Sequence, residues 1–239
     1  MGIFSIASAC AQGGPPMLTD DPGTPGSGHL ETNIAATVER GAHEQSWELP
    51  VFDLNYGVGE HIQLNFQTSM VLLKRDDRGP IGGWGDTSAA VKWRFLDEER
   101  NGVSLSVYPR LEWNSLRSSV RRGLVEDGTR LLLPAQIARG FGLVDVDAEA
   151  GVLLNAVGRS EWIYGIVAGV PVTSTTNVMV ELHGNARTNL TRDRLTVNAG
   201  FRQKLTAFSF LIASAGRDLR SAPGEQLSFV GYFGMQLVF

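Results

Sequence analysis

The chain has 239 residues and a formal net charge of −4; 43% of its residues are hydrophobic and 19% are charged. This size allows one large all-β domain or two small ones. Mean hydropathy is close to zero and no stretch of about 18 apolar residues occurs, which excludes a bundle of membrane helices. With a net negative charge and no basic run, the sequence does not favour nucleic-acid binding.

Residues 1–11 have features of a signal peptide. Ala9-Cys10-Ala11 fits the small-x-small rule of signal peptidase, with cleavage before Gln12. No Lys or Arg precedes it, so we interpret the stretch as a remnant of a signal. Cys10 is the only cysteine, so a mature chain that starts at Gln12 excludes disulfides, cysteine metal sites and cysteine catalysis. Lipidation of Cys10 is the less favoured alternative.

Residues 12–27 are rich in Gly and Pro and should be irregular. Two interpretations are equally open. The segment is either a stiff plug across the periplasmic mouth of the domain that follows, or a plain periplasmic leader. We expect residues 28–239 to form that single following domain.

The dominant pattern after residue 28 has period two, which is typical of β-strands. Each segment is about ten residues long, the length that a tilted strand needs to cross the hydrocarbon layer. The expected strands lie near 30–40, 47–57, 61–73, 85–95, 103–113, 131–139, 143–154, 161–170, 177–187, 195–204, 208–217 and 226–239.

The spacing of these strands favours an antiparallel transmembrane β-barrel of about twelve strands. Every second connection is a tight turn, whereas the others are longer and more polar, notably Lys74 to Trp84, Asn114 to Arg130 and Asp218 to Glu225. Short periplasmic turns, longer extracellular loops and an even strand number are the layout of outer-membrane barrels. A soluble secreted β-sandwich also alternates and stays open as an alternative.

The end of the chain points to the same class. An apolar face that ends in a C-terminal aromatic residue is the sorting feature that outer-membrane barrels share, and here it consists of Phe233, Met235, Leu237 and Phe239. We therefore expect a Gram-negative outer-membrane protein. Its partners would be the lipid bilayer, lipopolysaccharide and, through the last strand, the barrel-assembly machinery. The oligomeric state is unknown, and a monomer is favoured.

Three motifs resemble one known family. Leu18-Thr19-Asp20-Asp21-Pro22-Gly23-Thr24-Pro25 followed by Gly28-His29-Leu30-Glu31, Gly85-Asp86 leading to Val91-Lys92-Trp93-Arg94-Phe95, and Gly216-Arg217-Asp218-Leu219 are similar to the outer-membrane transporter family named for the meta-pathway of phenol degradation. The resemblance implies a barrel with a role in the uptake of hydrophobic or aromatic compounds. It supplies no established binding residues.

The polar face of the strands should line the lumen. Charges in so narrow a space are expected to pair across strands, because unpaired buried charge is costly; a polar track that orients a permeant solute is the sharper interpretation. The candidate lumen-lining residues are Asp86, Lys92, Arg94, Arg110, Glu112, Asp145, Asp147, Glu149, Glu181, His183, Arg187, Arg202, Lys204 and Arg217.

Three carboxylates of one strand, Asp145, Asp147 and Glu149, require counter-charges. The favoured partners are Arg110, Arg187, Arg202 and Lys204, and Ca²⁺ is a less favoured alternative.

The function that we expect is passage of small, hydrophobic or aromatic solutes, without catalysis, cofactor or metal. A structural or adhesion barrel would instead use the Asn114 to Arg130 loop. An outer-membrane lipid hydrolase would use His183 beside Glu181, but the sequence identifies no serine nucleophile for it.

Overall fold

The computed structural model describes residues 13–190 and 193–239, and nearly all of its regular structure is β-strand. Two short helices, α1 (Glu98–Asn101) and α2 (Arg117–Arg121), lie in connections, and no helix in the described ranges is long and apolar enough to cross a membrane. The strands are β1 (Leu30–Arg40), β2 (Glu44–Val58), β3 (Ile62–Arg75), β4 (Arg78–Leu96), β5 (Ser104–Val107), β6 (Arg110–Asn114), β7 (Arg130–Phe141), β8 (Val144–Asn155), β9 (Glu161–Pro171), β10 (Thr176–Arg187), β11 (Asp193–Lys204), β12 (Ser209–Arg220) and β13 (Phe229–Val238).

These strands form one closed antiparallel sheet. Apart from β5 and β6, strands that are neighbours in sequence pair with each other, and β1 closes the ring on β13 from Glu31 opposite Val238 to Arg40 opposite Phe229. β5 and β6 both lie between β4 and β7. They are two halves of one barrel strand, interrupted at Pro109, which has no N–H for the ladder. The predicted barrel of twelve strands is therefore confirmed.

The two faces of the barrel differ in chemistry as the alternation predicts. On β3, for example, Leu64, Phe66 and Met70 are exposed outward, whereas Gln63 and Asn65 are buried inside. An apolar outer face and a polar interior is the inverse of a soluble β-protein and fits a lipid environment. This closed ring excludes the soluble sandwich.

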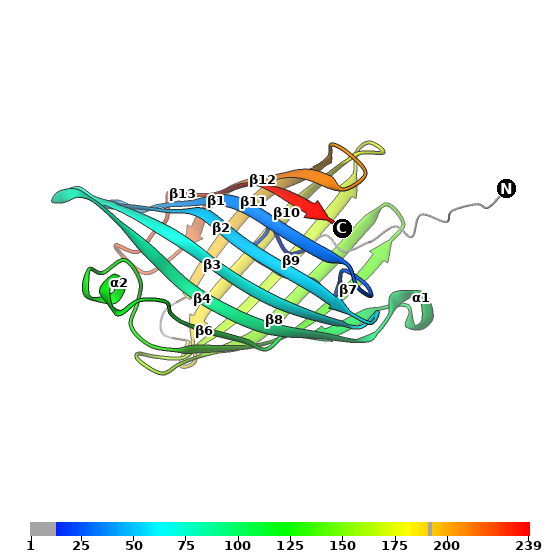
Figure 1. Cartoon of the computed structure of the whole chain (residues 1–239), viewed down its shortest axis with the longest axis horizontal. Helices are drawn as coiled ribbons and strands as arrows, with labels where there is room; N and C mark the ends of the chain where they lie inside the picture. The colour runs from blue at the N-terminus through cyan, green and yellow to red at the C-terminus, as the bar shows by residue number, and fades with distance from the viewer. Residues whose placement is uncertain (1–12, 191–192) are drawn as a thin grey trace.

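Both ends of the barrel chain meet at one rim. The backbones of Leu30 and Phe239 exchange hydrogen bonds in both directions, at 3.0 and 2.9 Å. The turns at this rim are short, except for the 97–103 connection that contains α1 (Figure 1). By the usual layout this is the periplasmic end.

The opposite, extracellular end differs from expectation at one connection. Lys74 to Trp84 was predicted to be a long loop, but β3 and β4 continue through it and pair as far as Arg75 opposite Arg78. The hairpin projects beyond its neighbours (Figure 1). The sequence of this extension is rich in charged residues and glycine and lacks the apolar–polar alternation by which the other strands were predicted. The longest connection at this end is 115–129, which contains α2.

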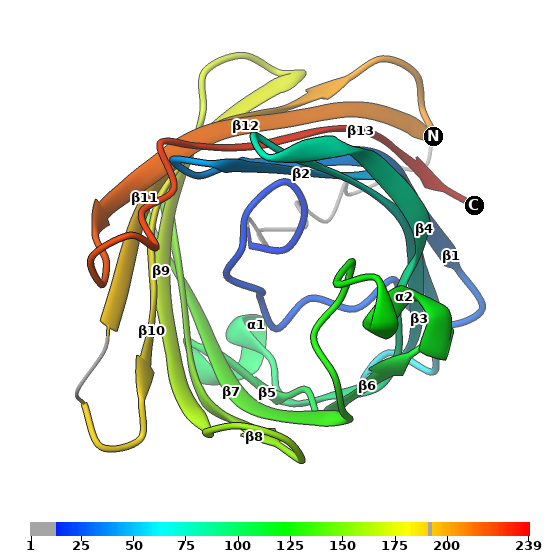
Figure 2. The same cartoon turned by 90° about the vertical axis from the view of Figure 1, so that its left-hand side faces the viewer.

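Two non-strand segments lie inside the ring. Residues 13–27, called the lumenal segment below, are drawn in dark blue within the barrel in Figure 2, and the α2 connection lies at the mouth that faces the viewer. The lumen is therefore occupied by the chain itself.

Candidate solute pathway: the barrel lumen

All but one of the candidate lumen residues share the inward-facing alternation of their strands. The exception is Arg217, which is exposed on the outer face with Ala215, because the β11–β12 register places it opposite Val197. Asp218 takes the inward position and is 2% exposed. Its carboxylate accepts hydrogen bonds from Thr196 Oγ1 at 2.8 Å and from the Leu227 N–H at 2.8 Å.

The first contact between the lumenal segment and the wall is an ion-pair cluster. Lys92 on β4 is 3% exposed, and its Nζ donates to Asp20 Oδ1 at 2.9 Å and to the Asp21 carbonyl oxygen at 2.5 Å. Arg110 on β6 lies 3.7 Å from Asp20 Oδ2. Tyr108 lies between the two cations, with its ring centroid 4.7 Å from Lys92 Nζ and 5.0 Å from Arg110 Cζ. Predicted lumen residues therefore meet a carboxylate that belongs to the segment.

The neighbouring carboxylate of the segment, that of Asp21, is buried. Burial raises the pKa of Asp21 to about 6; the negative charge of Asp20 adds to this effect, and nearby Lys92 opposes it. The Gly23 N–H also donates to Asp21. The protonation state of this side chain is therefore linked to how firmly the segment stays in place.

The second contact is made on the opposite wall by β10. Glu181 accepts hydrogen bonds from the Leu18 N–H at 3.1 Å and the Thr19 N–H at 2.5 Å. His183 Nδ1 lies 3.4 Å from Thr19 Oγ1. Since charge-assisted hydrogen bonds in a low-dielectric interior are stronger than neutral ones, the carboxylate is a strong anchor. His183 contacts a threonine of the segment.

Apolar and backbone contacts complete the seat of the segment. Met17 is 6% exposed and packs with Val167 and Met179. The Ser214 hydroxyl donates to the Pro16 carbonyl oxygen at 2.8 Å.

Glycines on the wall leave the space that the segment fills. A Cβ added to Gly57 would overlap the Gly26 carbonyl group, and one added to Gly165 would overlap the Thr19 side chain. A Cβ added to Gly200 would overlap the Met17 side chain. These strands carry glycine where the segment passes close to them, so the wall is shaped to hold the segment.

The wall carboxylates have donors on the wall itself. Asp53 accepts from the amides of Asn33 at 2.9 Å, Asn65 at 2.6 Å and Asn55 at 3.3 Å. Glu149 accepts from Gln136 Nε2 at 2.8 Å. The sequence alternation placed these polar residues inside but could not assign their partners.

At the extracellular mouth Arg130 forms ion pairs with three carboxylates. It contacts Asp86, Glu112 and, at 3.4 Å, Glu126. The connection that contains α2 also buries Leu124 against Val71 and Leu73 of β3. The basic loop proposed for adhesion is thus folded onto the mouth, and its Arg130 faces inward.

The remaining candidates lie away from the segment. Arg94 pairs with Asp97 at 2.7 Å near the periplasmic rim. On the inward face of β8, Asp145 is half-buried and Asp147 is buried. Arg187 is half-buried at the end of β10, and Lys204 is exposed at the end of β11. In the part of the chain that the structure describes, no group of three or more His, Cys, Asp or Glu side chains could hold a metal ion.

Arg202 on β11 faces a ring of the next strand. Its Cζ lies 4.1 Å from the centroid of Phe210.

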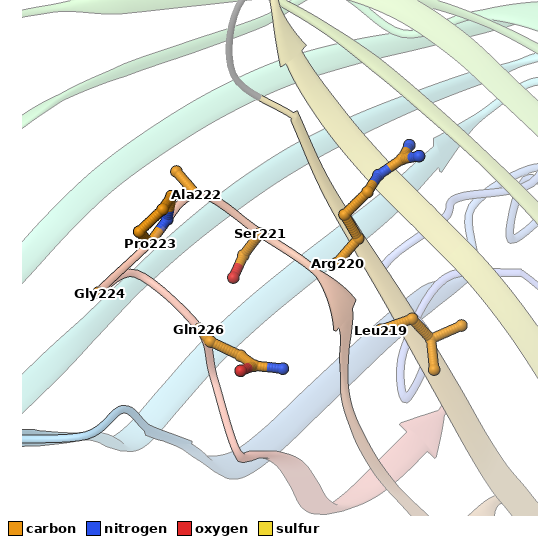
Figure 3. Close-up of a pocket in the computed structure, with 7 residues that line it drawn as sticks. All are labelled: Leu219, Arg220, Ser221, Ala222, Pro223, Gly224 and Gln226. Atoms are coloured by element: carbon orange, nitrogen blue, oxygen red, sulfur yellow. The ribbon is translucent and has the colours of Figure 1, made fainter.

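A cavity of about 670 Å³ surrounds the lumenal segment. Its wall includes Lys92, Tyr108, Arg110, Glu149 and Arg202, and its size lies within the range of roughly 300–1,000 Å³ of small-molecule sites. A second depression, of about 330 Å³, is formed by the end of β12 and the loop after it, from Leu219 to Gln226 (Figure 3). In this view the side chains splay from one turn and do not converge on a common point. The lumen cavity is therefore the candidate site.

Comparison with solved structures supports this fold. The chain resembles an outer membrane channel from Pseudomonas putida F1, with 15% identity, a TM-score of 0.66 and coverage of 95% of this chain and 100% of that one. It also resembles the NanC porin, with 9% identity, a TM-score of 0.61 and coverage of 87% and 98%. The CymD monoaromatic hydrocarbon channel gives 8% identity, a TM-score of 0.52 and coverage of 89% of each chain.

No protein-family model matches the sequence. No curated protein matches it closely enough to indicate a relative. The similarity therefore lies in the fold, which is that of outer-membrane β-barrels.

Proposed function

We propose that this protein is an outer-membrane channel for small solutes, with the lumenal segment as its internal plug. The observation that carries the proposal is the cavity of about 670 Å³ inside a closed barrel, bordered by a segment that is anchored at Lys92 and Glu181. A polar lumen of this kind serves a passive pathway better than catalysis, because its charged groups are engaged in holding the segment.

The solute class follows from a resemblance and from the lining. The motifs beginning at Leu18 and Gly85 resemble the phenol-degradation transporter family, and one protein of similar fold is a monoaromatic hydrocarbon channel. Tyr108, Phe210 and Tyr232 contribute rings to the cavity wall. We therefore propose small aromatic compounds as solutes.

Planar-bilayer recording and liposome swelling test the channel directly. Protein with residues 13–24 deleted should conduct ions and admit small solutes more readily than the full chain, because this deletion removes the groups that contact Lys92 and Glu181. Heat-modifiable migration on gels verifies that both proteins are folded barrels. Impermeability of both folded proteins to ions and to every small solute tested would refute the proposal.

A further inference from the structure

Two cations of the lumen wall form ion pairs with the lumenal segment. Lys92 and Arg110 both pair with Asp20 of the lumenal segment, at 2.9 and 3.7 Å. Lys92 makes its other hydrogen bond to the backbone of the same segment. When the segment leaves, a buried ammonium and a guanidinium lose these partners together, which is costly in a low-dielectric interior.

Two of the wall acids are differently placed. Asp53 is held by three wall amides, and Glu149, which borders the same cavity, is held by Gln136. These carboxylates keep their hydrogen bonds whether or not the segment is present. Withdrawal of Asp20 and Asp21 also removes two negative charges from the cavity, so the wall that remains is more cationic.

The cavity wall has hydrogen-bond donors that the lumenal segment does not satisfy. Arg110 Nε and Arg202 Nε are both buried and have no hydrogen-bond partner among the described residues. Both guanidinium groups border the cavity, and each lies over an aromatic ring, Tyr108 or Phe210. Buried donors without acceptors beside an open cavity indicate an acceptor-rich ligand. Arginine forks match carboxylates in particular.

From these contacts we infer that Lys92, Arg110 and Tyr108 form a binding site for the carboxylate group of a small organic anion, and that Asp20 occupies this site as an internal substitute when the segment is docked. This inference rests on the proposed function and narrows its solute class to carboxylates. The ring of an aromatic carboxylate would extend into the rest of the cavity. Solute and segment then compete for the same two cations.

Calorimetric titration of the purified, full-length barrel with benzoate tests the inference, in a buffer low in chloride. Asp20→Asn keeps the size of the side chain and removes its charge, so it should tighten benzoate binding by about tenfold to a hundredfold. Adding Arg110→Gln to that variant should abolish the gain. The matched control adds Arg94→Gln instead, since Arg94 pairs with Asp97 outside the cavity, and should leave binding unchanged.

Three results would overturn the inference in a barrel that passes the heat-modifiability check. They are unchanged benzoate affinity in Asp20→Asn, a gain in affinity that survives the addition of Arg110→Gln, and equally tight binding of benzamide, the neutral counterpart of benzoate. If Asp20→Asn does not fold, Asp20→Ala carries the same expectation. Titration requires no flux, so benzoate binding by a barrel that conducts nothing would refute the channel and leave the site standing.

Discussion

The anchor at Glu181 gives a quantitative prediction for the docking of the lumenal segment. Its carboxylate accepts from two backbone N–H groups, Leu18 and Thr19, and hydrogen bonds to a charged group contribute about 1.5–3 kcal/mol each. Glu181→Gln keeps one acceptor oxygen and turns an NH₂ group toward a donor. We expect docking to weaken by about 2 kcal/mol, which corresponds to about a 30-fold larger undocked population.

Labelling of a buried cysteine measures that population. Met17→Cys, in a chain with Cys10 replaced by Ser, places a thiol in the contact with Val167 and Met179. It should react with a membrane-impermeant maleimide only while the segment is undocked, so the labelling rate follows the undocked fraction when docking is fast. We expect Glu181→Gln to accelerate labelling by about 30-fold.

A second lumenal carboxylate provides the control. Glu161 accepts from Asn185 Nδ2 at 2.6 Å and contacts no part of the lumenal segment that the structure describes. Glu161→Gln should therefore leave the rate at the Met17→Cys thiol unchanged. Equal rates in Glu181→Gln and the parent, or a thiol that labels at once in both, would refute the docking of the segment through Glu181.

Further predictions follow from neighbouring contacts. Gly165→Val should expel the segment by overlap with Thr19 and raise single-channel conductance; unchanged conductance would contradict the fitted seat. Because burial raises the pKa of Asp21 to about 6 from an ordinary 3.8, docking should be firmest below the ordinary value and weaken as pH rises through 6. The thiolate is the form that reacts with maleimide, so the labelling rate at each pH is divided by the rate of an exposed cysteine. This ratio should be higher at pH 7.5 than at pH 5, and an equal ratio would argue against the link to Asp21. Asp53→Ala strands three amide donors and should destabilise the barrel by about 2–4 kcal/mol, seen as a lower midpoint in thermal gel-shift assays. Phe239→Ala should reduce barrel assembly in cells, with refolding into detergent micelles unaffected; normal assembly would show that the terminal ring is dispensable.

The alternation of apolar and polar residues predicted most of the barrel because its two faces meet different surroundings. Segments without this alternation were not predicted correctly from the pattern. The β3–β4 extension from Lys74 to Trp84 pairs as a strand although its sequence lacks the apolar–polar alternation. The residues before Arg217 are small, so their polarity does not show which of them face the lumen. Only the register with β11 shows that Asp218 is the inward residue.

The contacts of the lumen were beyond sequence analysis for a different reason. Asp20 and Lys92 are 72 positions apart, and Thr19 and Glu181 are 162 apart. Nothing local in the chain specifies such pairings. Composition did mark residues 12–27 as irregular, with a plug as one of two interpretations, and the cluster of Pro and Gly was the available signal. The wall glycines Gly57, Gly165 and Gly200 gave a further signal that becomes meaningful only once the segment is in place.

The short connection between the lumenal segment and β1 has a consequence for transport. Asp20 is joined through only a few residues to Gly28, which is itself fixed by its N–H to the Gly57 carbonyl oxygen at 3.0 Å. A group tethered so closely presents itself to Lys92 at an effective concentration in the millimolar range or above. A free carboxylate must reach comparable concentrations to displace it. Permeation should accordingly saturate only at high solute levels, and dilute anions should leave the barrel closed.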